Sequence, residues 1–189
     1  LDKEKNYFIK SEVDYYLKEA SQIKSNKFDI ELAYELINLY YEKLVAYSEF
    51  QINLIENTNF DFTADEYLDI FEDDNEWQVD ISGIEEIWRL ETKNDLLVAK
   101  LSDSSSDNPK EDISKRYKNR LRRIAQQKEE DIFSLAMNIL TNQFDPHSSY
   151  LSPRSAEDFD MNMSLKLSGI GALLGVDDDY TKVISLVPG

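Results

Sequence analysis

A change of hydrophobic period in the last quarter of the chain constrains its fold more than any other feature. Up to Asp145-Pro146, apolar residues recur every three or four positions, as in amphipathic helices. From Met161 they alternate with polar residues, as in a half-buried strand. Because a residue that precedes proline is disfavoured in the helical region, Asp145 should end the last long helix. We therefore predict a mainly α chain, with a helical domain over residues 1–158 and a few β-strands of a second domain over 159–189.

The spacing also predicts individual elements. Helices are predicted over residues 6–24, 28–57, 63–71, 84–101, 110–128 and 131–144. The third of these depends on a capping box formed by Thr63 and Glu66. The last is the most apolar, and we expect it near the centre of the helical domain. After the junction, a short helix should begin at Ser152-Pro153 and reach Phe159, followed by strands over 161–168, 172–176 and 181–187.

Composition and charge exclude several classes of function. A net charge of −17 over 189 residues argues against nucleic acid and anionic membrane as general partners. No run approaches the roughly 20 apolar residues that span a bilayer, so we expect no membrane insertion. With no cysteine and one histidine, a structural zinc site is excluded. The acidic loop 72–76 lacks the ligand spacing of a calcium loop, and we expect no cofactor.

One stretch of the chain reverses the sign of the charge. Residues 110–128 contain eight basic and two acidic side chains. A nucleic-acid contact is one interpretation. We favour a helix that docks against acidic neighbours in its own fold, because four apolar residues recur at spacings of four, four and three, as one helical face requires. These residues are Ile113, Tyr117, Leu121 and Ile124.

Two polar arrangements invite a catalytic interpretation that the sequence does not support. The sole histidine, His147, precedes Ser148 and Ser149, but side chains of adjacent residues diverge and cannot align as a catalytic triad. Ser164 and Lys166 lie on one face of a plain predicted strand, which is not a preorganised dyad. We therefore expect His147 to be a turn residue satisfied by the backbone.

The glycine-rich turn before the second predicted strand is a candidate binding site. In Gly169-Ile170-Gly171-Ala172, two glycines allow consecutive backbone N–H groups to converge on an anion. A peptide could add to the strand 172–176 as a further strand, with its terminal carboxylate held by those N–H groups. A simple hairpin bend would explain the same pattern.

Several runs in the chain together resemble one protein family. They are Arg116–Arg120, Asp145–Arg154, Met163–Leu165, Gly169–Ala172 and Asp177–Tyr180, with a looser likeness at Phe60–Thr63 and Ile87–Arg89. These runs are similar to the tail-specific proteases, which belong to the carboxyl-terminal processing peptidases. The resemblance is specific over residues 110–189 and looser over 1–109.

The resemblance implies a periplasmic serine endoprotease of a Gram-negative bacterium that recognises the apolar carboxyl termini of its substrates. In this family a helical domain precedes a PDZ domain and a catalytic domain with a Ser/Lys dyad. Residues 159–189 would then be the start of a truncated PDZ domain. The residues that match its carboxylate-binding loop and following strand are Gly169, Ile170, Gly171, Ala172 and Leu173.

No catalytic residue is implied within this sequence, because the matching regions end before the serine and the lysine of the family. The chain thus resembles an amino-terminal fragment that is inactive by itself. An alternative is a non-catalytic helical scaffold that docks a partner, such as an adaptor lipoprotein. A third is that the incomplete strands pair between chains through their open edges.

Overall fold

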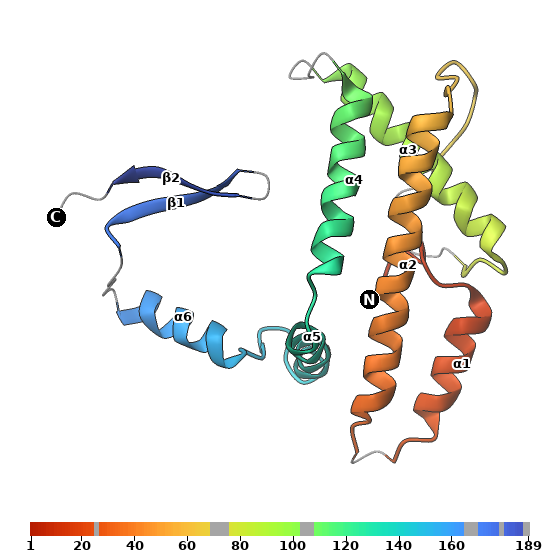
Figure 1. Ribbon diagram of the computed structural model, residues 1–189. Coiled ribbons are helices and arrows are strands. Elements are labelled where there is room, and N and C mark those ends of the chain that lie inside the picture. The colour runs from red at the N-terminus through yellow and green to blue at the C-terminus, as the bar shows by residue number, and fades with distance from the viewer. Residues whose placement is uncertain (25–26, 69–75, 103–107, 165–169, 178–179, 187–189) are drawn as a thin grey trace. The chain divides into compact units, whose positions relative to one another are not determined.

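The structure is a computed structural model that describes residues 1–24, 27–68, 76–102, 108–164, 170–177 and 180–186. It divides the chain into two compact units, Leu1–Ser148 and Ser149–Gly189. Helices dominate the first unit, and the described residues of the second form one helix and a hairpin (Figure 1). The mainly α fold with a few strands is therefore confirmed. The domain boundary at residue 158 stays a prediction.

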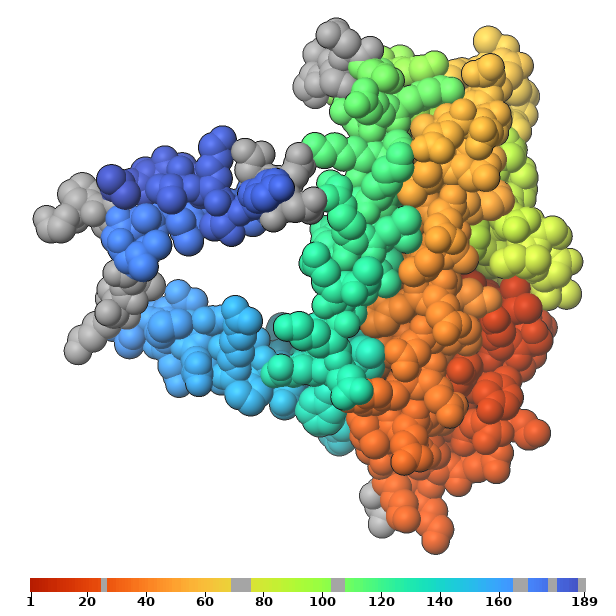
Figure 2. All heavy atoms as spheres, in the orientation of Figure 1, coloured from red at the N-terminus to blue at the C-terminus, as the bar shows by residue number. Residues whose placement is uncertain are grey.

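The first unit is built around α2 (Ile30–Asn57), which packs against α3 (Ile81–Leu101), α4 (Pro109–Ala125) and α5 (Glu129–Asn142). Figure 2 shows the adjoining surfaces of α2 and α4. The backbone N–H of Leu32 donates to the side chain of Asp29 at 3.0 Å, which caps the first turn of α2. Periodicity alone predicts this helix almost residue for residue.

Two clusters of buried side chains form the core of the first unit. One lies where α2, α3 and α4 meet and contains Ile55, Leu96, Ile113 and Tyr117. The other lies nearer the amino-terminal end of α2 and contains Tyr47, Ile84 and Trp88. An edge-to-face contact between Tyr47 and Tyr117, with ring centroids 6.2 Å apart, connects the two clusters.

The segment before α1 (Lys10–Ser21) is held by polar contacts rather than by helical hydrogen bonds. The carboxylate of Asp2 accepts from the backbone N–H groups of Asn6, Tyr7 and Phe8 at 2.9 to 3.0 Å. The indole N–H of Trp88 donates to the carbonyl oxygen of Asn6 at 2.7 Å. Helix α1 therefore begins four residues later than predicted, because these backbone groups already have other partners.

The helix predicted from residue 63 is wrong over the described residues 63–68. Asp61 accepts from the backbone N–H and the hydroxyl of Thr63, at 2.9 and 2.7 Å, so Thr63 donates to a local turn instead of capping a helix. Glu66 pairs with Arg89 and Lys93 on α3. The capping box fails because both of its members have these other partners. The rest of this predicted helix, and the acidic loop apart from its last residue, lie outside the described residues.

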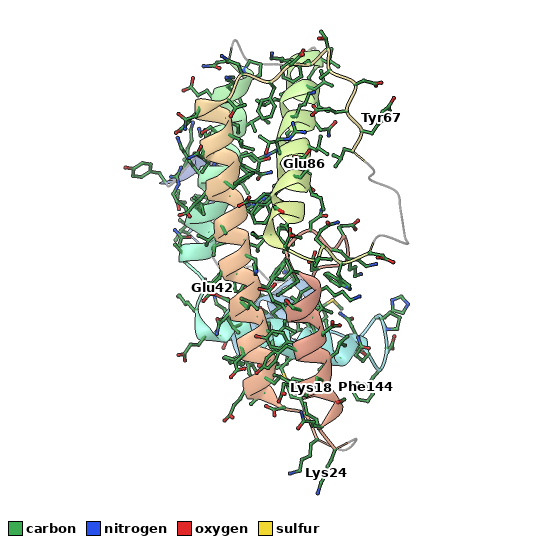
Figure 3. The ribbon with its side chains drawn as sticks, turned by 90° about the vertical axis from the view of Figure 1, so that its right-hand side faces the viewer. Lys18, Lys24, Glu42, Tyr67, Glu86 and Phe144 are labelled. Carbon is green, nitrogen blue, oxygen red and sulfur yellow. The ribbon has the colours of Figure 1, made fainter. Side chains whose placement is uncertain are left out.

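Helix α5 does not occupy the centre that its apolar composition suggested. Ala136 is its one fully buried residue, whereas Ile139 is 38% exposed. Phe144, just beyond the helix, is 84% exposed, and its side chain lies at the surface in Figure 3. A high apolar content favours burial of a helix, but it does not determine which elements pack against that helix. The central position belongs to α2.

The basic helix α4 docks within its own fold, as we favoured. Ile113 and Tyr117 are buried. Arg116 pairs with Asp95 of α3, and the ammonium of Lys118 lies 3.0 Å from a carboxylate oxygen of Glu56 on α2. Acidic neighbours on two helices thus meet this locally basic stretch.

In the second unit, α6 (Pro153–Ser164) begins where predicted but continues past residue 159. The backbone N–H of Ala156 donates to the carbonyl oxygen of Ser152 at 2.8 Å. The strand predicted over 161–168 is wrong at 161–164, which are helical, and its remainder lies outside the described residues. Phe159 and Met163 are four positions apart, so they also satisfy a helical period.

The hairpin after α6 matches the other two predicted strands. Strand β1 (Ala172–Asp177) pairs antiparallel with β2 (Tyr180–Leu186). Among the residues that the structure describes, these two strands make up the whole sheet. A two-stranded hairpin is marginally stable alone. Its position after a glycine-rich turn makes it the candidate site.

Candidate functional site

Strand β1 has one paired edge and one open edge. Its paired edge faces β2, with Ala172 opposite Leu186 and Asp177 opposite Tyr180. No described strand pairs with its other edge. Leu173 and Leu174 are 53% and 46% exposed, so each face of the strand presents an apolar side chain. An open edge flanked by apolar side chains is suited to the addition of an extended peptide.

The described members of the predicted carboxylate-binding set lie just before β1 and at its start. Gly171 has a φ of 68°, in the left-handed region that glycine adopts without strain. Ile170 is 80% exposed. The structure brings Ile170, Gly171, Ala172 and Leu173 together at the start of the open-edged strand, whereas Gly169 lies outside the described residues. Their role in binding a carboxylate stays a prediction.

A bulge in the hairpin is a feature that sequence reasoning missed. Leu173 pairs with Ser185 and Leu174 with Val183, which leaves Ile184 as an extra residue in β2. A Cβ atom on Gly175 would lie 2.6 Å from Cδ1 of Ile184. Gly175 therefore provides the space that the Ile184 side chain occupies. The sequence did contain one signal of this bulge, because Gly175 is an isolated glycine within an otherwise apolar strand.

The histidine-containing turn shows no catalytic arrangement. The backbone N–H of His147 donates to Oδ1 of Asp145 at 2.9 Å, and the imidazole is exposed. The backbone N–H of Ser148 donates to the carbonyl oxygen of Asp145 at 2.9 Å. The interpretation of His147 as a turn residue is confirmed for its backbone. Ser164 donates to the carbonyl oxygen of Met161 on α6 at 2.9 Å, and Lys166 lies outside the described residues.

A second group of polar residues, which we call the interhelical polar cluster, lies between α2, α3 and α4. Its members are Tyr47, Glu91, Asp95, Tyr117 and Arg120. The hydroxyl of Tyr47 donates to Glu91 at 2.8 Å, and that of Tyr117 donates to Asp95. The guanidinium of Arg120 lies 5.2 Å from the ring centroid of Tyr47 and 5.4 Å from that of Tyr117.

The interhelical polar cluster connects three helices. Each carboxylate accepts from a tyrosine on another helix, and Arg120 lies over both rings. Glu91 also accepts from the side-chain amide of Asn6 at 2.9 Å, which attaches the amino-terminal segment to α3. Sequence reasoning missed the cluster because its members belong to three helices and meet only in the folded state.

Glu91 should make stability depend on pH. Burial is the largest influence on its carboxyl and raises its pKa, whereas the hydrogen bond from Tyr47 opposes that rise. The folded state then binds a proton more tightly than the unfolded state, in which a Glu pKa is about 4.3. Stability contributed by this group therefore falls as pH rises from about 4 through the raised pKa. We expect Glu91→Gln to remove this fall, measured as unfolding free energies in urea at several pH values.

Glu49→Gln provides the control for this prediction, because Glu49 is an exposed glutamate on α2. This variant keeps the Glu91 carboxyl, so the fall in its unfolding free energy with rising pH should persist. Subtracting the unfolding free energy of Glu91→Gln from that of wild type at each pH leaves the contribution of the Glu91 carboxyl alone. A difference that does not change with pH would contradict the assignment to Glu91.

Comparison with known proteins identifies a family for most of the chain. The family model described as "Tail specific protease N-terminal domain" matches residues 1–154. The chain therefore belongs to the family of tail-specific protease amino-terminal domains. It is also 29% identical over 194 residues to a tail-specific protease of Haemophilus influenzae. That alignment covers 100% of this chain and 28% of the relative, so the chain spans less than a third of the relative's length.

Proposed function

We propose that this chain is the amino-terminal part of a periplasmic serine endoprotease that selects proteins by their apolar carboxyl termini. Its membership of the family supports a protease as the parent protein. In this proposal the Ser/Lys dyad is supplied by residues outside this sequence. Among the described residues, no helix is both long and apolar enough to cross a membrane.

The observation that carries the proposal is a glycine in the left-handed region directly before a strand with an open edge. Gly171 allows the chain to turn so that backbone N–H groups can face a terminal carboxylate. The last residues of a substrate would then pair with β1 on the side away from β2. Exposed apolar side chains on β1 are suited to apolar residues of the tail.

The proposal is tested by the binding of short peptides to the full-length protease. A fluorescent peptide that ends in apolar residues with a free carboxylate should bind, and its amidated form should bind at least about tenfold more weakly, because it lacks the charge that the N–H groups hold. Gly171→Val should reduce binding of the free-carboxylate peptide by a similar factor, since a β-branched residue is strained at a φ of 68°.

Thr181→Ala is the matched control, because Thr181 lies on β2, away from the open edge of β1. Its affinity should stay within about twofold of wild type, as expected for an exposed substitution outside the binding edge. Equal affinity for the amidated and free peptides would contradict carboxylate recognition. A separate assay addresses the location of the chemistry: residues 1–189 alone should cleave no peptide, and robust cleavage would contradict a dyad outside this sequence.

A second candidate function, the docking of a partner or adaptor protein, is favoured by an apolar groove in the first unit. The groove has a volume of about 400 Å³ and lies between α1, α2 and α5. Leu17 and Ile139, which line it, are 64% and 38% exposed. Leu17→Glu and Ile139→Glu should abolish such docking without changing binding of carboxyl-terminal peptides. Retained binding of a purified adaptor by both variants would contradict it.

A further inference from the structure

The amino-terminal segment, residues 1–9, forms one wall of the apolar groove between α1, α2 and α5. Asp2, Lys3 and Phe8 line this groove together with side chains of the three helices. Phe8 is 4% exposed and stacks on Tyr40, with ring centroids 6.2 Å apart. The segment is not helical, since α1 begins after it. The shape of the groove therefore depends on the contacts that hold a non-helical segment in place.

Two of these contacts meet at Asn6, and we call the pair the Asn6 latch. The side-chain amide of Asn6 donates to Oε1 of Glu91 at 2.9 Å. The carbonyl oxygen of Asn6 accepts from the indole N–H of Trp88 at 2.7 Å. Glu91 and Trp88 belong to α3, and neither this helix nor Asn6 lines the groove. A change at the latch can thus act on the groove only through the amino-terminal segment.

The carboxyl of Glu91 is the ionisable member of the latch. The ionisable groups that face it are Tyr47 on α2, Asp95 on α3, Arg120 on α4, and Asp2 and Tyr7 of the segment. Burial is the largest influence on this carboxyl and raises its pKa. The two aspartates also raise its pKa, whereas the hydrogen bond from Tyr47 and the charge of Arg120 lower it. Ionisation of Glu91 is therefore disfavoured while the segment lies against it.

We propose that the Asn6 latch completes the apolar groove and that protonation of Glu91 keeps the latch closed. This inference rests on the proposed docking of a partner in that groove. Release of the segment returns Glu91 to water, which removes the largest cause of its raised pKa. The latched form then binds the proton more tightly, so protonation contributes most to the latch below the ordinary glutamate pKa of about 4.3. That contribution is lost as pH rises through the raised pKa, and docking in the groove weakens with it.

The segment should leave its place without unfolding of the helices. Among residues 1–9, Phe8 is the one fully buried side chain. The backbone N–H groups of Asn6, Tyr7 and Phe8 donate to Asp2 of the same segment rather than to a helix. Because segments with few buried contacts open at a lower free energy than a helical core, this wall of the groove is its most easily displaced part.

The first test is amide hydrogen exchange of the complete 189-residue chain at about pH 5 and about pH 8, on either side of the expected transition. After correction for intrinsic exchange rates, protection of the Phe8 amide should fall at least about threefold over this range. In Glu91→Gln it should stay constant, because the neutral amide can still accept from Asn6 and donate to Tyr47. The amide of Leu96 in the core should be at least about tenfold more protected than that of Phe8. Equal protection of the two amides would mean that the segment leaves only on global unfolding, which overturns the latch.

The second test measures the groove itself with Nile red, a neutral dye that fluoresces in apolar surroundings. Its affinity for the chain should fall at least about threefold between the two pH values, and Glu91→Gln should remove this fall. Asn6→Ala should weaken dye binding at both pH values, although Asn6 does not line the groove. Asn38→Ala is the matched control, since Asn38 is exposed on α2, and its affinity should stay within about twofold of wild type. Glu49→Gln should keep the wild-type pH dependence, because Glu49 is exposed.

Leu17→Glu distinguishes failure of the latch from failure of docking in the groove. Leu17 lines the groove, so this variant should abolish dye binding at both pH values. Dye binding that is absent in wild type, or that survives Leu17→Glu, would overturn the docking proposal and the inference that rests on it. Dye binding that Leu17→Glu abolishes, but that does not respond to pH or to Asn6→Ala, would overturn the latch and leave the docking proposal intact.

Discussion

Replacing Trp88 by alanine is expected to lower the free energy of unfolding by about 4 kcal/mol, the largest effect of any single substitution considered for this chain. The Trp88 side chain is 2% exposed and packs edge-to-face against Tyr47 and Phe50, with ring centroids 5.3 and 5.6 Å apart. Its removal leaves a cavity and deprives the carbonyl oxygen of Asn6 of its indole donor. Urea unfolding followed by circular dichroism measures the loss.

Trp88→Phe separates the two contributions of this residue. It keeps an aromatic ring in the cluster but removes the indole N–H, so we expect a smaller loss of about 1 to 2 kcal/mol. In both variants, backbone amides of Asn6 to Phe8 should exchange hydrogen faster, because Trp88 no longer holds the segment before α1. Equal destabilisation by the two substitutions would show that packing of the ring contributes little.

The sequence was sufficient to predict most helices, because each buries one face with a period close to 3.6. Helix α2 was predicted over 28–57 and is observed at Ile30–Asn57. The failures have a common physical cause. Thr63 and Glu66 match a capping motif, yet one donates within a local turn and the other pairs with α3. Phe159 and Met163 fit both a helix and the start of a strand. A sequence pattern of four or five residues fits more than one local structure, and contacts with residues distant in the sequence decide which one forms.

The candidate site was predicted less completely than the fold. The spacing of glycines located the turn before β1, and the left-handed φ at Gly171 agrees with the need for glycine there. The bulge at Ile184 depends on the register between two strands, which alternation leaves undetermined. Glu91 appears in the sequence as one acidic residue among 38 Asp and Glu. Its contacts with Tyr47 and Asn6 exist only once three separate segments meet.

The cluster formed by α2, α3 and α4 should be the second most sensitive part of the first unit. Leu96 is 1% exposed and packs with Ile55, Ile113 and Tyr117. Leu96→Ala should therefore lower the free energy of unfolding by about 3 kcal/mol, through lost burial and the cavity that remains. Because the substitution acts on packing, the denaturant midpoint should fall while the slope of the transition stays constant.

Val98 offers a control two positions further along the same helix. It is 59% exposed, so Val98→Ala removes apolar atoms that are already in contact with water. We expect a change within about 0.5 kcal/mol. A large loss at Val98 with a small one at Leu96 would mean that α3 presents its other face to the core. Losses of about 3 kcal/mol at both positions would mean that both faces of α3 are covered in solution, which contradicts the exposure of Val98.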